Sequence, residues 1–168
     1  MVLSEEDPMA VSVSIARSIP LNCDVIVPLL RAQLEILEEA SEHGTVVLAA
    51  RLPGNGRVAV PVRLSVRYPA PKNPRFGLTI VALRTPALYP KFRGEIEPTE
   101  AGTAVTILKL SGEYQVPLGL LGRAIDASAA HGIAPRGLED LLNRLVADLL
   151  VSVASKSDAE YRAARHTE

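Results

Sequence analysis

One charged side chain of this sequence, Arg17, falls in phase with a row of apolar residues. Val13, Ile15 and Ile19 alternate with serine and alanine, and Arg17 shares their parity. A period of two is typical of a half-buried strand, so Arg17 is expected on the inward face of that strand. Its guanidinium offers a planar fork of donors that fits a carboxylate or a phosphate. One interpretation is an anchor for an acidic head group; the other is a strand-end arginine that reaches solvent or pairs with a nearby acid.

Two tyrosines, Tyr68 and Tyr114, share predicted strand faces with apolar residues. Each hydroxyl is a candidate hydrogen-bond donor, or weak acid, toward a bound ligand. The alternative is a core tyrosine whose hydroxyl reaches the surface or a backbone carbonyl. Tyr89 and Phe92 stand beside prolines in a connection between strands. They either gate a pocket entrance or anchor this loop on the core.

The remaining candidates do not predict a catalytic centre. Asp126 as a catalytic carboxylate needs a partner acid or base, and none recurs at an obvious spacing, so a capping or ion-pair role is expected. Cys23 begins a predicted helix whose N-terminus should lower the pKa of the thiol, but a small buried residue is its expected role. His43, His131 and His166 are isolated, which does not fit a metal site. G-x-S-x-G, H-E-x-x-H and Walker motifs are missing, so we assign no catalytic residue, metal or cofactor.

The elements that must position these groups follow from the hydrophobic period. After the first strand, residues 23–42 have a helical period. Pro28 and the pair Glu38-Glu39 interrupt this period, so two short helices are predicted. Gly44 is expected to end the second of them. Strand patterns occupy residues 46–52, 57–68, 76–84, 91–97 and 103–114, with turns at Asn55-Gly56 and at residues 98–102. Six strands joined by short connections predict an antiparallel meander.

A long amphipathic helix is predicted at the end of the chain. Eight apolar residues follow the i, i+3, i+4, i+7 rule: Leu138, Leu141, Leu142, Leu145, Val146, Leu149, Leu150 and Val153. A shorter helical segment, 120–130, precedes them, and the two glycines and one proline of residues 131–137 predict a break between the two. The order of elements is α+β, and the final helix must cover the apolar face of the sheet. A helix across a curved sheet often leaves a cavity for a small ligand.

Composition narrows the class of protein. The chain has 168 residues, a length typical of one domain, and its net charge of −1 argues against a nucleic-acid binder. The single cysteine excludes an intramolecular disulfide, and no apolar run approaches the roughly 18 residues of a membrane span. Because the acidic N-terminus does not resemble a signal peptide, we expect a cytoplasmic protein. Residues 1–9 are expected to be disordered, 10–154 to form the domain, and 155–168 to be a tail or an extension of the final helix.

The run Gly112–Asp126, with the sequence Gly-Glu-Tyr-Gln-Val-Pro-Leu-Gly-Leu-Leu-Gly-Arg-Ala-Ile-Asp, resembles the SRPBCC superfamily of START-like and polyketide cyclase/dehydrase-like proteins. Arg17–Pro20, Phe92–Ile96 and Gly102 support the resemblance, which covers roughly residues 10–155 and is to bacterial members more than to any named enzyme. It implies a helix-grip fold, in which a curved antiparallel sheet of about six to seven strands wraps around the C-terminal helix. The predicted break before that helix departs from the family pattern.

We therefore expect the protein to bind or transport a hydrophobic small molecule (a lipid, an isoprenoid or a polyketide-like compound) between the sheet and the final helix. Apolar burial would supply the affinity, and Arg17 or a tyrosine the orientation. The predicted ligand-binding residues are Arg17, Val60, Leu64, Tyr68, Leu78, Ile80, Phe92, Leu110, Tyr114, Leu142, Leu145 and Leu149.

Two alternatives stay open. One is a polyketide cyclase/dehydratase-like enzyme, in which Tyr114, Arg17 or Asp126 converge within hydrogen-bond reach; catalysis is the less favoured interpretation. The other is a pocketless protein that binds a macromolecular partner or forms a homodimer through an exposed sheet edge. The expected partners are thus a hydrophobic small molecule and a possible second copy, with no nucleic acid and no membrane span.

Overall fold

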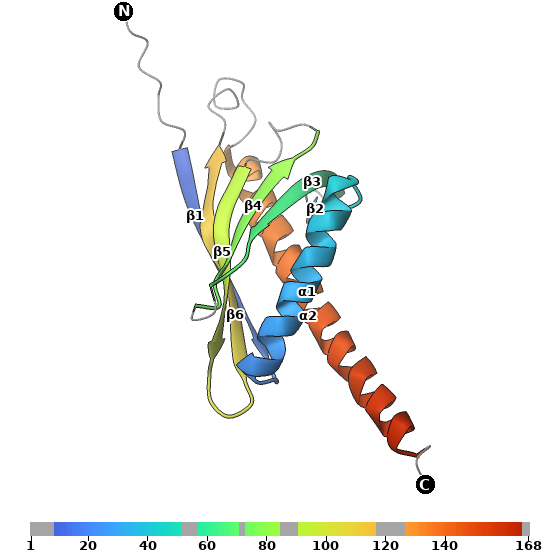
Figure 1. The fold of residues 1–168 in the computed structure, drawn as a ribbon. Helices are drawn as coiled ribbons and strands as arrows, with labels where there is room; N and C mark the ends of the chain where they lie inside the picture. Colours follow the sequence, from blue (N-terminus) through green and yellow to red (C-terminus); the bar gives the residue numbers. More distant parts are fainter. Residues whose placement is uncertain (1–8, 52–56, 71–72, 85–90, 117–126, 166–168) are drawn as a thin grey trace, which may run out of the picture.

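The computed structural model describes residues 9–51, 57–70, 73–84, 91–116 and 127–165. Six strands form one antiparallel sheet in the order β1-β6-β5-β4-β3-β2, and two helices pack on one face of it (Figure 1). In chain order the elements are β1 (Met9–Ile19), α1 (Cys23–Glu42), β2 (Val47–Arg51), β3 (Arg57–Arg67), β4 (Phe76–Ala82), β5 (Lys91–Glu100), β6 (Thr106–Val116) and α2 (Ala127–Arg165). This confirms the predicted α+β fold with a curved antiparallel sheet and a long C-terminal helix.

Strands β2 to β6 form a meander, and the first strand closes it by pairing with the last. Along β1 and β6, Val11 lies opposite Tyr114 and Arg17 lies opposite Leu108. The side chains at alternate positions of each strand therefore point toward the helices, and the others form an outer face. The outer face carries most of the charged side chains of the sheet.

A pair of glycines allows two central strands to approach closely. Gly94 of β5 lies directly opposite Gly112 of β6. A Cβ atom on either residue would collide with the backbone of the partner strand and with the Phe92 ring, so no other residue fits without a shift of the backbone. Paired glycines are a usual means of bending a sheet. The resulting curvature brings the inner face around the helices (Figure 1).

The segment after β1 is one helix, so the prediction of two short helices is wrong. α1 runs through Pro28, and Ile26, Leu29, Leu30 and Leu34 of this helix are buried. A proline inside a helix costs about 3 kcal/mol, but each buried leucine or isoleucine contributes about 1.5–3 kcal/mol. Burial against the sheet therefore outweighs the local penalty.

The C-terminus of α1 agrees with the prediction. The backbone N–H of Gly44 donates to Ser41 O (3.0 Å), and that of Thr45 donates to Ala40 O (3.2 Å). Gly44 has a φ of +69°, which glycine adopts without a steric cost. These two bonds form a Schellman motif that ends the helix and turns the chain into β2.

The predicted break near residues 131–137 is also wrong, because α2 is continuous from Ala127 to Arg165. Its helix includes Pro135, and the buried stripe begins three residues later at Leu138. The packing of this stripe on the sheet favours one helix over the local preference for a break. Residues 120–126 of the shorter predicted helix and the Asn55-Gly56 turn lie outside the described residues. None of the described helices is both long and apolar enough to span a membrane.

One strand boundary differs from the prediction as well. Pro98 was expected in a turn, but it lies within β5, opposite Leu108 of β6. The turn between these strands starts at Ala101, whose N–H donates to Val105 O (2.9 Å). Proline lacks only the N–H donor, so it fits a strand position that does not need one.

Candidate functional site

The predicted ligand-binding residues lie on the inner face of the sheet and on the stripe of α2 that covers it. Apart from Arg17 and Tyr68, none is more than 3% exposed, and they belong to one apolar core: Val60, Leu64, Leu78, Ile80, Phe92, Leu110, Tyr114, Leu142, Leu145 and Leu149. The predicted pattern of inward faces thus agrees with the observed burial. The interior that these side chains share is aliphatic, with Phe76, Phe92 and Tyr114 as its buried rings.

Tyr114 differs from the other buried polar groups of this interior. Two fully buried hydroxyl groups are bonded: Thr106 Oγ1 donates to Leu21 O (2.8 Å), and Ser41 Oγ accepts from Leu64 N (3.0 Å). Tyr114 is 1% exposed, yet within the described part of the chain no group forms a hydrogen bond with its hydroxyl. Burial raises the pKa of Tyr114. The hydroxyl is therefore protonated at neutral pH and is a donor without an acceptor among the residues that the structure describes.

Tyr68 was also predicted to point inward, but its hydroxyl and its ring both have partners in the protein. Its hydroxyl donates to Glu38 Oε2 (3.1 Å), while Glu38 Oε1 accepts from Val66 N (2.8 Å). The Arg31 guanidinium lies over the Tyr68 ring at 5.2 Å from its centroid. Burial, followed by the bond to Glu38, raises the pKa of Tyr68 to about 12. This tyrosine joins α1 to β3, so its hydroxyl is occupied by the protein itself.

Arg17 is likewise occupied by protein groups. Its Nη2 donates to Glu139 Oε1 (2.6 Å), its Nε to Asn143 Oδ1 (2.7 Å), and its Nη1 to Ala16 O (2.9 Å). Glu139 and Asn143 are four residues apart on α2 and so share one side of that helix. Of the two interpretations of Arg17, this geometry supports the second, a strand-end arginine that pairs with an acid. Arg17 joins β1 to α2.

The strand register separates Arg17 from Tyr114. Tyr114 lies opposite Val11 of β1, six positions from Arg17, and six residues of a strand span about 20 Å. The predicted convergence of these two side chains within hydrogen-bond reach is therefore wrong.

The pKa of the Cys23 thiol also differs from the prediction. Burial raises its pKa, and the carboxylates of Glu100 and Asp24 add to the rise, whereas a lowered pKa was expected from the helix N-terminus. The thiol donates to Pro98 O (3.9 Å), so it packs as a small half-buried residue. Asp126, Tyr89 and His166 lie outside the described residues. Among those described, no three His, Cys, Asp or Glu side chains gather as a metal-binding cluster.

Three residues with clear structural roles were missed in the sequence: Glu38, Glu139 and Asn143. Glu38 was interpreted as part of a helix break, but its carboxylate accepts two hydrogen bonds from β3 and the residue that follows it. Glu139 and Asn143 lie outside the apolar stripe predicted for the final helix, and neither was chosen as a candidate. Their spacing of four was the available signal for a shared contact.

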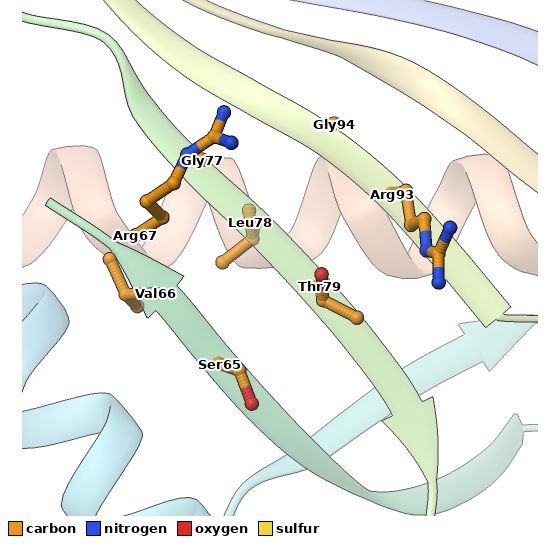
Figure 2. A pocket seen from close by; sticks show the side chains of 8 residues that line it. All are labelled: Ser65, Val66, Arg67, Gly77, Leu78, Thr79, Arg93 and Gly94. Carbon is orange, nitrogen blue, oxygen red and sulfur yellow. The ribbon is translucent and has the colours of Figure 1, made fainter. Parts of the chain in front are cut away.

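Two surface hollows lined by described residues lie on the sheet. The hollow in Figure 2 has a volume of about 480 Å³ and is lined by side chains of β3, β4 and β5, with α2 behind the sheet in this view. A neighbouring hollow of about 490 Å³ shares Arg93 and Gly94 with it. Both open on the outer face.

A scan of protein-family models and a search of curated proteins return no match for this chain. Solved structures do match it over most of its length. The protein Ara h 8.0201 has a TM-score of 0.54 at 10% identity, covering 88% of this chain and 99% of its own. Norcoclaurine synthase from Thalictrum flavum has a TM-score of 0.55 at 11% identity, covering 90% and 96%.

A protein from Thermus thermophilus has a TM-score of 0.50 at 15% identity, covering 84% of this chain and 98% of its own. Identities this low show a common fold and nothing more specific. The shared features are the curved antiparallel sheet and the long C-terminal helix. This chain therefore has the helix-grip fold of Ara h 8.0201 and norcoclaurine synthase.

Proposed function

We propose that this protein binds a hydrophobic small molecule that carries a hydrogen-bond acceptor, between the inner face of the sheet and α2. The proposal rests on one observation: a buried tyrosine hydroxyl without an acceptor among the described residues, in a largely apolar interior whose two other fully buried hydroxyls are bonded. Leaving a buried donor unbonded costs about 1–3 kcal/mol. A carbonyl or ether oxygen of a ligand at Tyr114 removes that cost and fixes the orientation of the ligand.

Two further points support the proposal. Norcoclaurine synthase, which shares the fold, has been solved in complex with dopamine and hydroxybenzaldehyde, so this fold holds small organic molecules in at least one protein. The run Gly112–Asp126 resembles the SRPBCC superfamily, to which we also assign this chain. The aliphatic interior favours an apolar ligand body, because burial contributes about 25 cal/mol for each Å² of apolar surface before the costs of binding.

Native mass spectrometry of the full chain, purified from a lipid-rich host, tests the proposal directly. A bound hydrophobic molecule at near-stoichiometric occupancy is the expected result, and denaturation followed by identification of the released molecule gives its chemical class. Complete burial of Leu142, Leu145 and Leu149 is common to the wall of an enclosed cavity and to a filled core. A substitution that enlarges one of these side chains separates the two cases.

Leu145→Phe is that substitution, because Leu145 is fully buried. If the interior holds a ligand, the larger ring occupies its place, so the bound mass is lost while the ligand-free protein keeps its stability. If the core is filled, the extra volume lowers the free energy of unfolding by about 1–3 kcal/mol, and the proposal fails. Leu150→Phe is the matched control, since Leu150 on the same helix is 40% exposed and should change neither quantity.

A further inference from the structure

The outer face of the sheet carries a hollow whose lining combines four hydrogen-bond-donating side chains with two glycines and two apolar residues. Four polar side chains surround it: Ser65 and Arg67 from β3, Thr79 from β4, and Arg93 from β5 (Figure 2). They are held in register, with Ser65 opposite Thr79 and Thr79 opposite Arg93. The remaining lining residues are Val66, Gly77, Leu78 and Gly94. Its volume of about 480 Å³ lies within the range of small-molecule sites.

Gly77 allows one of the two arginines to reach into this hollow. Arg67 lies directly opposite Gly77, and its side chain crosses the place where a Cβ of Gly77 would stand. A Cβ built there would come within 3.1 Å of Arg67 Nε and 3.3 Å of its Nη2. In Figure 2 the Arg67 guanidinium accordingly lies over Gly77 of β4. Arg93 of β5 lies at the other end of the hollow, beyond Thr79 (Figure 2).

These two arginines have no acidic partner among the residues that the structure describes. Within the described part of the chain neither forms an ion pair, whereas Arg17 and Arg75 each bind glutamates. Three acids lie on the outer face of β5 and β6 near these arginines: Glu95, which stands directly opposite Gly77, Glu97 and Glu113. Arg75 binds Glu95 (3.5 Å) and Glu97 (2.9 Å), and Glu113 stands opposite Arg93 on the side away from Arg67 and lines the neighbouring hollow. The lining of the hollow itself contains no carboxylate.

We propose that this hollow binds a phosphate monoester group. Arg67 and Arg93 stand at opposite ends of the hollow (Figure 2); their two positive charges match the two negative charges of the group, and Arg–phosphate contacts are frequently bidentate. The hydroxyls of Ser65 and Thr79 supply further donors to its oxygens. The hollow opens on the face opposite the helices, so this site is independent of the ligand proposed at Tyr114. The phosphate belongs either to a soluble ester or to a lipid headgroup.

An NMR titration of the full chain with inorganic phosphate, at constant ionic strength set by sodium chloride, tests the site. The expected result is a saturable shift confined to the amides around the hollow, namely those of residues 65–67, 77–79 and 93–94. Arg67→Gln and Arg93→Gln should each weaken binding by about tenfold, because each removes charge-assisted hydrogen bonds. Glu113→Gln should strengthen it, since it removes a nearby negative charge.

Arg63→Gln is the matched control, because Arg63 lies on the same face of β3 but does not line the hollow. It should change the affinity by no more than about twofold, as expected for a screened surface charge. Shifts that do not saturate, or that weaken equally in Arg63→Gln, would overturn the proposal. Unchanged thermal melting of each variant shows that the loss of binding is not a loss of folding.

Flotation with phosphatidylcholine vesicles, with and without phosphatidic acid, distinguishes the two sources. Binding that needs phosphatidic acid and is lost in Arg67→Gln assigns the site to a lipid headgroup. Saturable binding of inorganic phosphate without flotation assigns it to a soluble ester. Absence of both phosphate binding and flotation overturns the proposal.

Discussion

Replacing Tyr114 by phenylalanine removes one oxygen atom from the core and nothing else. Because this hydroxyl is buried and has no acceptor among the described residues, its removal should stabilise the ligand-free protein. The gain should be about 1–3 kcal/mol, the cost of an unbonded buried polar group. In a chain of this length each kcal/mol raises Tm by about 2–4 °C. The same substitution should weaken ligand binding by about two- to tenfold, the net value of one hydrogen bond.

Urea unfolding of protein refolded free of ligand measures the first effect, and titration with the molecule released from the native protein measures the second. Tyr68→Phe is the control, because it removes the same atom from a hydroxyl that donates to Glu38. It should lower stability by about 1 kcal/mol. The two variants therefore shift stability in opposite directions although their sequence change is identical.

The opposite result for Tyr114→Phe would refute this reasoning. A loss of about 1 kcal/mol or more in the ligand-free protein means that the hydroxyl has a partner in the folded chain. Equal affinity of the variant and the native protein for the ligand means that the hydroxyl does not contact it. In either case the proposed orientation of the ligand is wrong.

Three other properties follow from the same structure. Gly94→Ala should destabilise the protein by about 1–3 kcal/mol or more, because the new Cβ meets backbone, whereas Gly77→Ala meets a flexible side chain and should cost less; thermal melting compares them. The folded-state pKa of Tyr68 is about 12, against an ordinary value of 10.0. The contribution of Tyr68 to stability is therefore complete below pH 10 and is lost as the pH rises toward 12. Between these pH values, the urea midpoint of Tyr68→Phe should fall less than that of the native protein. The raised pKa of the Cys23 thiol predicts slower alkylation by iodoacetamide at neutral pH than that of a free cysteine, and a faster rate would contradict it.

Local periodicity was sufficient for most of the secondary structure. The alternation of Val13 and Ile15 with serines, and the leucine spacing from Leu138 onward, depend only on neighbours along the chain. The end of α1 at Gly44 is also local, because the Schellman motif involves six consecutive residues. For this reason the strands, the final helix and the inward faces agree with the prediction.

The predictions that failed are those in which a local penalty competes with distant contacts. Pro28 and Pro135 each disfavour a helix locally, but residues one to three positions later, Leu29 and Leu30 in α1 and Leu138 in α2, are buried in the core that the helices form with the sheet. The helix propensity of a residue includes only the local cost. The burial that compensates for this cost depends on the contacts between the helix and the sheet, which the sequence pattern does not give. Each of the two segments in which an interruption was predicted is therefore one continuous helix, α1 or α2.

The same distinction between local pattern and distant contacts applies to the candidate site. The sequence by itself determined that Arg17, Tyr68 and Tyr114 point inward, since parity along a strand sets the side of the sheet. Only the tertiary structure decided their partners: Glu139 is 122 residues from Arg17, Glu38 is 30 residues from Tyr68, and no described group accepts from Tyr114. A hydrogen bond needs its two atoms within about 3 Å, and which distant residues come that close is determined by the packing of α1 and α2 on the sheet.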